Sequence, residues 1–286
     1  MRRRDAVFHL KDKYLVSERR ACVVTGQPRS TQRNLPVLRQ EECFLLQKIE
    51  QLVRENPRCG YRRITAMLRL EGWRVNHKRI HRLWKQEGYR VPTPKKKLKA
   101  SGSSMYACNK KIAKGKNDIW TYDFIFDRLE NGRALKILAV TDEYTRESLA
   151  LIVGESATGA TVASVLDRLS IKHGFPNYVR SDNGSEFTSS AVKKWFAASG
   201  TEGLYVEKGA SWQNGYAESF NSRFRDECLN MNLFSTVKEA SAIIADWQSQ
   251  YNHRRPHSAL GGLPPSLFAE QWAKNNHITT AEILSI

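Results

Sequence analysis

Two different spacings of apolar residues divide the chain. Over the first 91 residues, apolar positions recur every three or four residues, which is typical of amphipathic helices. The predicted helices of this region cover residues 6–14, 17–24, 35–53, 61–70 and 76–87. Further along, runs of β-branched and aromatic residues predict strands at 119–126, 134–141, 147–153, 178–181 and 203–206. Helical spacing returns among and after the later strands, at 158–173, 189–199 and 213–230.

The order of the predicted elements in the second region indicates its fold. Three strands come first, with a hairpin turn at Asn131-Gly132 between the first two, and helices then alternate with two short strands. Such an order produces a mixed sheet with helices packed against it. It is the order of the RNase H-like fold. We therefore expect an α/β, RNase H-like mixed-sheet core preceded by an all-α segment.

The last two helices of the first region have the helix-turn-helix pattern. Residues 61–70 and 76–87 are joined by a short turn that contains Gly72, and Asn76 is a suitable N-cap for the second helix. In a major groove, the start of the second helix could meet base edges while its basic side chains met phosphates. The basic side chains that we expect to contact DNA are Lys78, Arg79, Arg82 and Lys85. The alternative is a small helical bundle with a solvated basic face.

A segment poor in apolar residues separates the two regions. It contains two prolines, four lysines and a Gly/Ser tail, a composition that makes a poor core and a good tether. We expect Lys95, Lys96 and Lys97 to lie along a DNA backbone. The predicted organisation is a helical DNA-binding region (1–91), a linker (92–104), a catalytic core (105–235), and a C-terminal helix and tail packed on the core (236–286).

Charge is distributed unevenly along the 286 residues. The whole chain has 46 Lys and Arg against 29 Asp and Glu, a net charge of +17. Residues 1–100 contain 26 of the basic and 9 of the acidic residues, so the first third carries all of the excess and the remainder has 20 of each. A basic region of this kind indicates a polyanionic partner, either nucleic acid or an anionic membrane surface.

Several classes of protein are excluded by the same sequence. No apolar run approaches the ~20 residues that span a bilayer. The start of the chain lacks the apolar stretch of a secretory signal, so we expect a cytoplasmic protein. Five scattered cysteines without a Cys-x-x-Cys pair argue against a disulfide framework and a structural zinc site.

Three carboxylates carry the candidate chemistry. Asp123 lies in the middle of the first predicted strand, where an ionised side chain among apolar residues is costly unless it binds a cation. Asp182 directly follows the fourth strand, and Glu218 lies near the start of the last predicted long helix. Carboxylate oxygens are the ligands of hard divalent cations. Three converging acids could hold two ions of Mg²⁺ or Mn²⁺ in one active site and assist displacement at a phosphodiester.

The residues around these acids resemble a known family. The motifs are Trp120-Thr121-Tyr122-Asp123-Phe124, Thr145-Arg146-Glu147, Ser181-Asp182-Asn183-Gly184-Ser185-Glu186-Phe187, Gln213-Asn214-Gly215, Glu218-Ser219-Phe220-Asn221, Tyr251-Asn252 and Arg255-Pro256-His257-Ser258-Ala259-Leu260-Gly261. They are similar to those of the D-D-E insertion-sequence transposases, and closely to the catalytic subunit encoded by the second reading frame of a large bacterial group related to retroviral integrases. The likeness is strong over residues 105–270 and moderate over the N-terminal helices.

This resemblance implies particular roles and partners. Asp123, Asp182 and Glu218 would be the catalytic and metal-binding triad of a D-D-E polynucleotidyl transferase. The basic residue that such enzymes carry seven positions after the glutamate is Arg225 here. Within the matching motifs, the further candidate DNA contacts are Asn214, Arg62 and Arg63. The implied partners are the terminal inverted repeats and target DNA, further copies of the chain in a synaptic complex, and an upstream-frame DNA-binding subunit, separate or fused.

The implied activity is metal-dependent cleavage and transfer of DNA strands at the ends of a bacterial insertion sequence. Two alternatives are a DNA-binding regulator with a non-catalytic RNase H-like module and a structure-selective nuclease. The family often has Pro-Gly-Lys-Pro before the Gln-Asn-Gly element, whereas this chain has Lys208-Gly209-Ala210-Ser211-Trp212. That difference affects the expected contacts of the loop rather than the triad.

Other residues have weaker functional interpretations. His253 and His257 have a zinc-ligand spacing, but Pro256 lies between them and no acidic base accompanies them, so we expect a loop packed on the core or near DNA. For Asp142 and Glu147 we expect a place at the surface or a supporting role beside the triad. The aromatic residues Trp212 and Tyr216 could stack on bases or could simply pack beside a loop.

Overall fold

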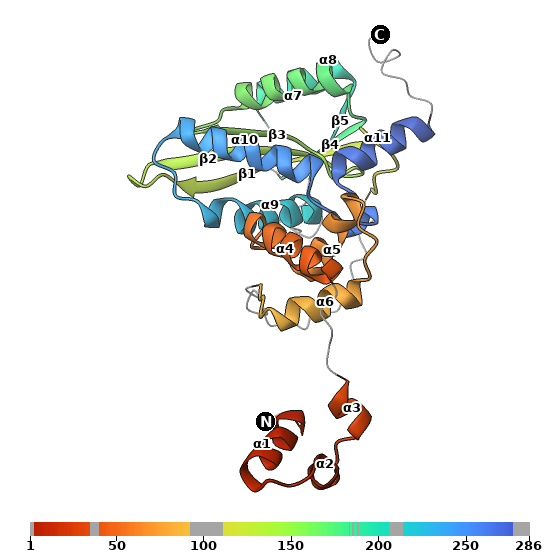
Figure 1. Cartoon of the computed structure of the whole chain (residues 1–286). Helices are drawn as coiled ribbons and strands as arrows, with labels where there is room; N and C mark the ends of the chain where they lie inside the picture. The colour runs from red at the N-terminus through yellow and green to blue at the C-terminus, as the bar shows by residue number, and fades with distance from the viewer. Residues whose placement is uncertain are drawn as a thin grey trace, which may run out of the picture. The chain divides into compact units, whose positions relative to one another are not determined.

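The computed structural model describes residues 3–34, 40–91, 111–182, 184, 186–187, 189–205 and 214–276 (Figure 1). Backbone contacts divide the chain into two units, Met1–Glu55 and Asn56–Ile286. This division falls within the helical region predicted for residues 1–91. The predicted linker (92–104), with Lys95, Lys96 and Lys97, lies outside the described residues.

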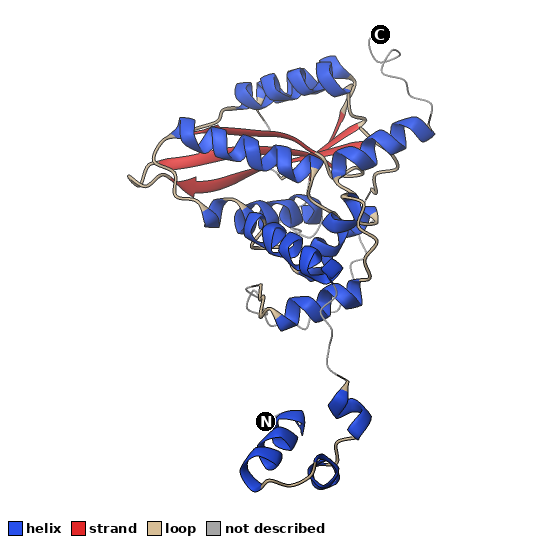
Figure 2. Cartoon of the chain, in the orientation of Figure 1, coloured by secondary structure: helices blue, strands red, loops and turns tan. Residues whose placement is uncertain are grey.

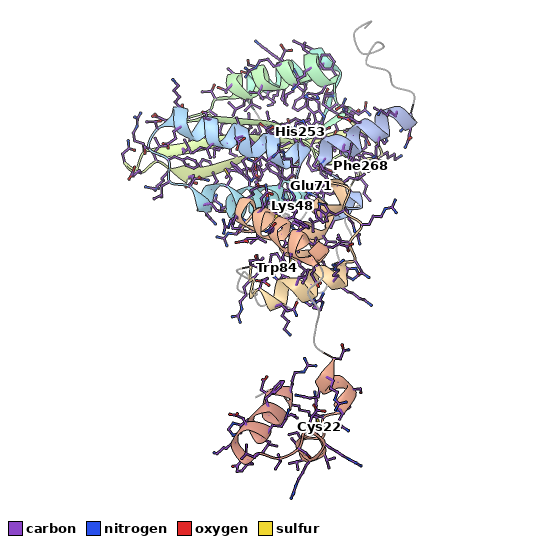
Figure 3. The ribbon with its side chains drawn as sticks, viewed as in Figure 1. Cys22, Lys48, Glu71, Trp84, His253 and Phe268 are labelled. Carbon is purple, nitrogen blue, oxygen red and sulfur yellow. The ribbon has the colours of Figure 1, made fainter. Side chains whose placement is uncertain are left out.

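The first unit is helical in its described residues (Figure 2). Its helices are α1 (Arg3–Tyr14), α2 (Glu18–Thr25), α3 (Arg29–Arg33) and α4 (Gln40–Glu55). Ser17 caps α2, because its Oγ accepts a hydrogen bond from the Arg20 N–H. Val7, Ala21 and Cys22 form a small buried core (Figure 3). The short helix α3 was not predicted, because Arg29–Arg33 contains no apolar residue to produce a periodic pattern.

The second unit begins with the two helices of the predicted helix-turn-helix. They are α5 (Tyr61–Leu70) and α6 (His77–Gln86). The Asn76 side chain caps α6 by accepting a hydrogen bond from the Lys78 N–H at 2.9 Å. The apolar residues of the two helices that are buried are Ile64, Met67, Leu68, Ile80, Leu83 and Trp84. Burial of this stripe leaves the basic side of α6 exposed.

A five-stranded mixed sheet forms the centre of the second unit. Its strands are β1 (Ile119–Arg128), β2 (Ala134–Asp142), β3 (Ser148–Gly154), β4 (Tyr178–Ser181) and β5 (Glu202–Tyr205). They are arranged in the order β3-β2-β1-β4-β5. β1, β2 and β3 pair antiparallel, whereas β4 pairs parallel to β1 and to β5. The expected α/β, RNase H-like mixed sheet is therefore confirmed, with each strand within two residues of its predicted ends.

Helices cover both faces of this sheet (Figures 1 and 2). Alternate residues of β1 point to opposite faces, so Trp120 and Tyr122 pack with α7 (Gly159–His173) and α8 (Ser190–Ser199). Ile125 packs on the other face with Phe220 and Phe224 of α9 (Gly215–Glu227) and with α10 (Val237–His253). The core on this second face fixes α9 against β1, the strand that carries Asp123.

The C-terminal part of the second unit contains more helices than predicted. The described residues after Ser235 form α10 and α11 (Pro265–Asn275), with the short 3₁₀ helix Ser258–Leu260 between them, where a single helix was expected. The predicted helix over 213–230 begins at Gly215 and ends at Glu227, before a second 3₁₀ turn at Leu229–Met231. Within the described ranges, no helix has both the length and the apolar character that crossing a bilayer requires.

Candidate active site

Two of the predicted catalytic acids lie on neighbouring strands. β1 and β4 run parallel with Thr121 opposite Arg180, so the same register two residues further on sets Asp123 beside Asp182. Neighbouring strands are about 4.8 Å apart. Asp182 is exposed at the carboxyl end of β4, where its Oδ1 accepts a hydrogen bond from the Gly184 N–H at 3.0 Å. The pairing of the strands therefore brings two acids to one edge of the sheet.

The third predicted acid comes from α9. Asn221 of this helix donates a hydrogen bond from Nδ2 to Asp123 Oδ2 at 2.7 Å. Glu218 precedes Asn221 by three residues, which is about one helical turn, so both side chains project from the same side of α9. Phe220 and Phe224 anchor the helix in the core below β1. Sequence analysis quoted Asn221 within a motif but gave it no role, although its spacing from Glu218 is the signal that identifies it.

Asp123 has a carboxyl group with a perturbed pKa. Burial raises its pKa to about 6, and the nearby carboxylates of Asp182 and Glu218 raise it as well. Hydrogen bonds from the Phe124 N–H at 2.8 Å and from Asn221 oppose these effects. An ionised Asp123 is thus surrounded by like charge and low polarity. A bound cation would stabilise the charged form.

The donor atoms suit a hard divalent cation. In the part of the chain that the structure describes, no group of three His, Cys, Asp or Glu residues is close enough to hold a metal ion by itself. Mg²⁺, however, is usually held by one or two carboxylates together with water and substrate phosphates. Asp123 and Asp182 supply two carboxylates from adjacent strands. Glu218 is close enough for its charge to raise the pKa of Asp123.

Most of the predicted DNA-contacting residues in the described helices are accessible. The exposed basic residues are Lys78, Arg82 and Lys85 of α6, Arg62 of α5 and Arg225 of α9. Arg79 is partly exposed. Arg225 also donates to the Phe126 carbonyl at 3.0 Å, which holds it against the end of β1. These side chains are at least partly exposed to solvent, and the DNA contacts themselves stay a prediction.

Two other predicted DNA contacts have partners inside the protein. Arg63 donates from Nη1 to Glu227 Oε1 at 2.8 Å, in a pair whose side chains are 27% and 10% exposed. Asn214 is buried, and its Oδ1 accepts a hydrogen bond from Thr121 Oγ1 at 2.8 Å. The geometry therefore favours a structural role for both: Arg63 links α5 to α9, and Asn214 links the start of α9 to β1.

Sequence analysis missed the ion-pair cluster around Glu227. Arg255 donates to both carboxylate oxygens of Glu227, from Nε at 2.6 Å and from Nη2 at 2.8 Å, while Arg63 shares Oε1. Burial raises the pKa of Glu227, but the hydrogen bonds and charge of Arg255, with those of Arg63, lower it below its usual range overall. The only available signal was the Arg255-Pro256-His257 motif, which does not reveal its distant partner.

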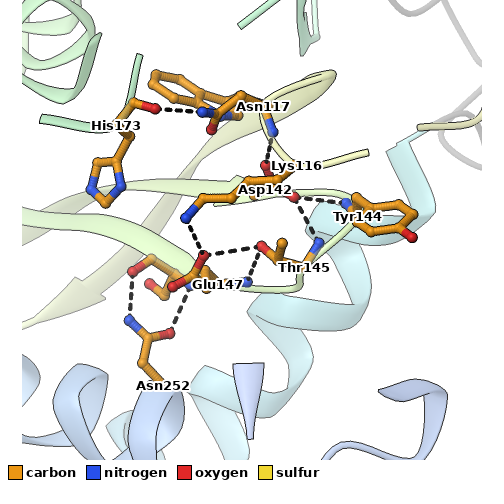
Figure 4. Close-up of polar contacts among 10 residues, drawn as sticks. Lys116, Asn117, Asp142, Tyr144, Thr145, Glu147, His173 and Asn252 are labelled. Carbon is orange, nitrogen blue, oxygen red and sulfur yellow. Dashed lines mark hydrogen bonds and ion pairs between the residues drawn. The ribbon is translucent and has the colours of Figure 1, made fainter. Parts of the chain in front are cut away.

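Of the two expectations for Asp142, a surface position or a supporting role, the surface position is wrong. Asp142 is 1% exposed, and its carboxylate accepts hydrogen bonds from the backbone N–H groups of Asn117, Tyr144 and Thr145 (Figure 4). Glu147 is also largely covered, with Lys116 Nζ at 3.9 Å. Both acids hold the connection between β2 and β3, because an Asp that follows a strand can cap the turn that comes next.

The two histidines do not form a metal pair with any described acid or cysteine. His253 is the exposed last residue of α10, whereas the Nε2 of His257 is hydrogen-bonded to the Tyr251 hydroxyl at 3.0 Å. The segment after α10 therefore packs on the core, as predicted for a loop at this position. Trp212 lies outside the described residues, and Tyr216 packs beneath the guanidinium of Arg146 at 3.9 Å.

Comparison with known proteins places this site in a family. The integrase core domain family matches two overlapping segments, residues 113–210 and 199–265. The HTH-like domain family matches residues 39–97. Among solved structures, the HTLV-2 integrase catalytic core domain in complex with magnesium (trimeric form) aligns with 54% of this chain and 97% of its own, at 14% identity and a TM-score of 0.41.

Relatives from insertion elements match nearly the whole chain. The insertion element IS476 39.2 kDa protein of Xanthomonas euvesicatoria is 40% identical over 95% of this chain and 78% of its own length. The IS407 31.7 kDa protein of Burkholderia multivorans is 40% identical over 91% of this chain and 93% of its own. Transposase InsD of the Escherichia coli element IS2 is 25% identical over 82% and 81%. The chain belongs to the insertion-element transposases that contain an integrase core domain.

Proposed function

We propose that this transposase cleaves and joins DNA strands at the ends of its insertion element, using Asp123, Asp182 and Glu218 to hold divalent cations, Mg²⁺ or Mn²⁺, two per active site. The observation that carries the proposal is the register of β1 and β4, which sets the carboxylates of Asp123 and Asp182 side by side at one edge of the sheet. The hydrogen bond between Asn221 and Asp123 holds the turn of α9 that contains Glu218 next to them. Family membership supports polynucleotidyl transfer in general, and this arrangement supports a D-D-E site.

The residues of the chain have separate tasks in this site. Asn221 fixes the orientation of the Asp123 carboxylate, and the aromatic core under α9 fixes the helix that carries Glu218. Asp182 is exposed, so a cation that it held would be accessible to a DNA phosphate from solvent. A bound divalent cation would supply Lewis acidity at the phosphodiester and lower the pKa of an attacking water. Arg225, two helical turns after Glu218, would orient the DNA backbone toward the acids.

DNA binding is assigned to the basic surface of the helix-turn-helix. The burial of Ile80, Leu83 and Trp84 supports this, because it leaves the basic side chains of α6 accessible. The residues that we propose to contact DNA there are Lys78, Arg79, Arg82, Lys85 and Arg62. Lys95, Lys96 and Lys97 would add phosphate contacts. The affinity should fall steeply with salt, since such contacts release counterions.

The proposed partners follow from the same activity. The substrate would be double-stranded DNA, as the terminal inverted repeats of the element and as target. Two ends must be paired for strand transfer, so we propose a homo-oligomer in a synaptic complex. A separate or fused upstream-frame subunit would supply further DNA binding.

The deciding experiment compares Asp182→Asn with Asp167→Asn, which removes an exposed acid of α7. Each protein is incubated with labelled element ends and Mg²⁺. Asp182→Asn should abolish cleavage and joining while end binding is retained, and Asp167→Asn should behave like the unmodified protein. Cleavage by Asp182→Asn would overturn the triad. Cutting without joining by the unmodified protein would indicate a nuclease, and binding without either reaction would indicate a regulator.

A further inference from the structure

A cavity of about 290 Å³ lies beside α9 and does not include the candidate catalytic acids. Its walls come from the β2–β3 connection, the first half of α9, and the segment after α10. The lining side chains that matter here are Arg146, Tyr216, Ser219, Arg223 and His257. No role has been assigned above to Arg146, Ser219 or Arg223.

The cavity and the proposed active site lie on different sides of one helix. With 3.6 residues per turn, residues 216, 219 and 223 of α9 share one side, whereas Glu218, Asn221 and Arg225 share another. Asn221 contacts Asp123, and Ser219 and Arg223 line the cavity. A ligand in the cavity would therefore touch the helix that carries Glu218 without occupying the site of the acids.

Positive charge predominates among the side chains of the cavity. Arg223 is exposed and makes no hydrogen bond or ion pair with any residue that the structure describes. Partial burial and the charges of Arg255 and Arg63 lower its pKa, and the charge of Glu227 only partly opposes them. Burial and the same arginines, with Arg223 and Arg146, lower the pKa of His257 to about 3, so this imidazole is neutral. An anion is the ligand that such surroundings favour.

The acids nearest the cavity already have partners. Glu227 is held by Arg255 and Arg63. Asp142 lines the cavity, but both of its carboxylate oxygens accept backbone hydrogen bonds, Oδ1 from Tyr144 and Thr145 and Oδ2 from Asn117. Neither carboxylate therefore pairs with Arg146 or Arg223. The two guanidinium groups remain available to an external anion.

The backbone holds Arg146 in an unusual conformation. Its φ of 63° lies in the left-handed region, which is uncommon for a residue other than glycine. Asp142 fixes the turn before it, and Asn252 of α10 fixes Ser148 after it, donating to the Ser148 carbonyl and accepting from the Ser148 N–H, both at 2.9 Å (Figure 4). Such a conformation persists only where the surroundings impose it, and it often marks a functional side chain.

We propose that this cavity binds a phosphate group of DNA, with Arg146, Arg223 and the Ser219 hydroxyl as donors. Guanidinium groups suit phosphate because their planar N–H donors match its oxygens. Arg146 is held over the Tyr216 ring, so its guanidinium is ordered before the anion arrives. The residues of the cavity support an anion as its ligand, whereas the inference that the anion belongs to DNA rests on the proposed function. A phosphate held here would fix the strand relative to α9 and so to Glu218.

The first test measures the binding of element-end duplex to the full chain without divalent metal, over a series of salt concentrations. Arg223→Gln should weaken binding and make the slope of log K against log[salt] shallower by about 1, which is the effect of one lost phosphate contact. Arg223→Lys should restore most of the slope. Arg168→Gln, which removes an exposed arginine of α7, is the matched control and should leave both quantities unchanged.

Arg223→Gln should also leave the midpoint of thermal unfolding unchanged, because no described partner loses a contact. Arg146→Asn, a residue type that tolerates the left-handed conformation, provides a second variant with the same expected loss of slope. Equal slopes for Arg223→Gln, Arg146→Asn and the Arg168→Gln control would overturn the proposal. This measurement reads binding, so it is independent of whether Asp182→Asn abolishes cleavage.

The second test identifies the carrier of the phosphate. Binding of inorganic phosphate is followed by ³¹P nuclear magnetic resonance, with and without duplex. We expect weak phosphate binding that is lost in Arg223→Gln and displaced by duplex. Phosphate binding that duplex does not displace would assign the cavity to a free anion and overturn the proposal for DNA. Absence of phosphate binding from the unmodified protein would overturn the anion site.

Discussion

Asp123 and Glu227 are two largely buried carboxylates that have opposite surroundings. Both lie at α9, Asp123 through its hydrogen bond with Asn221 and Glu227 as the last residue of the helix. Burial raises the pKa of both, yet that of Asp123 ends well above its usual range while Arg255 and Arg63 bring that of Glu227 below it. The charge of Glu227 is paired within the protein and holds helices together, whereas the charge of Asp123 is left for a bound cation to balance.

The arginines near α9 show the same contrast between paired and unpaired charge. Arg63 and Arg255 are matched by Glu227, whereas Arg146 and Arg223 have no carboxylate partner among the described residues. α9 therefore borders an excess of negative charge on one side and an excess of positive charge on another. We expect a cation to be bound at the first and a phosphate at the second.

Removing the balanced carboxylate should have the largest effect on stability. Glu227→Gln leaves Arg63 and Arg255 without an opposing charge, and breaking a buried ion pair from one side costs about 3–5 kcal/mol. We expect a loss of that order in the free energy of unfolding, measured with urea. Glu155→Gln breaks the exposed pair with Arg133 and should cost less than about 1 kcal/mol. Equal losses in the two variants would remove the distinction between the clusters.

Neutralising Asp123 should increase stability, whereas neutralising Glu227 should decrease it. The pKa of Asp123 rises from 3.8 to about 6 on folding, so the metal-free folded state favours the protonated form and loses stability as pH rises between these values. Asp123→Asn should therefore stabilise the metal-free protein at pH 7 by up to about 3 kcal/mol, since one pKa unit corresponds to about 1.4 kcal/mol.

Thermal unfolding at pH 4 and pH 7 checks this expectation. The advantage of Asp123→Asn should be small at pH 4 and larger at pH 7, while strand cleavage is lost. The buried Asn221 Oδ1, which has no hydrogen-bond partner in the described structure, could accept from the new amide. An Asp123→Asn protein that is less stable than the unmodified one at both pH values would show that Asp123 is a structural acid.

Two adjacent arginines of α5 provide the smallest and most direct comparison. Among the described residues, exposed Arg62 contacts only the neighbouring Tyr61 ring and hydroxyl, whereas Arg63 pairs with Glu227. Arg62→Gln should change the free energy of unfolding by less than about 0.5 kcal/mol and make the salt dependence of DNA binding shallower by about 1. Compared with Arg62→Gln, Arg63→Gln should lower the free energy of unfolding more and change the salt dependence of DNA binding less. The reverse result would exchange the roles of the two residues.

The sequence predicted the elements whose patterns are local. The strand that carries Asp123 is rich in aromatic and β-branched residues, and Ser17 and Asn76 are capping residues at the positions where helices begin. Such signals depend on neighbouring residues alone. The expected positions of the acids, within one strand, after another and near the start of a helix, followed from these elements.

The sequence could not reveal pairings between distant residues. Arg62 and Arg63 look alike along the chain, and only the fold brings Glu227, 164 residues away, to one of them. Asn214 seemed available to DNA until the packing of α9 buried it against Thr121. The cavity beside α9 is lined by three segments that are far apart in the sequence: the β2–β3 connection, α9 and the residues after α10. Contacts of this kind depend on how helices pack, which the periodicity of a single helix does not specify.

The parallel pairing of β4 with β1 also determines when the site can exist during synthesis. Asp123 and Asp182 meet only after the intervening helix α7 has been made, and Glu218 follows 36 residues after Asp182. At bacterial rates of translation, the interval from Asp123 to Glu218 is roughly 5–20 s. A nascent chain therefore contains α5 and α6 before it contains Glu218. If α5 and α6 bind element ends as proposed, any product that stops short of α9 would retain these helices without Glu218 and would compete with the complete protein for those ends.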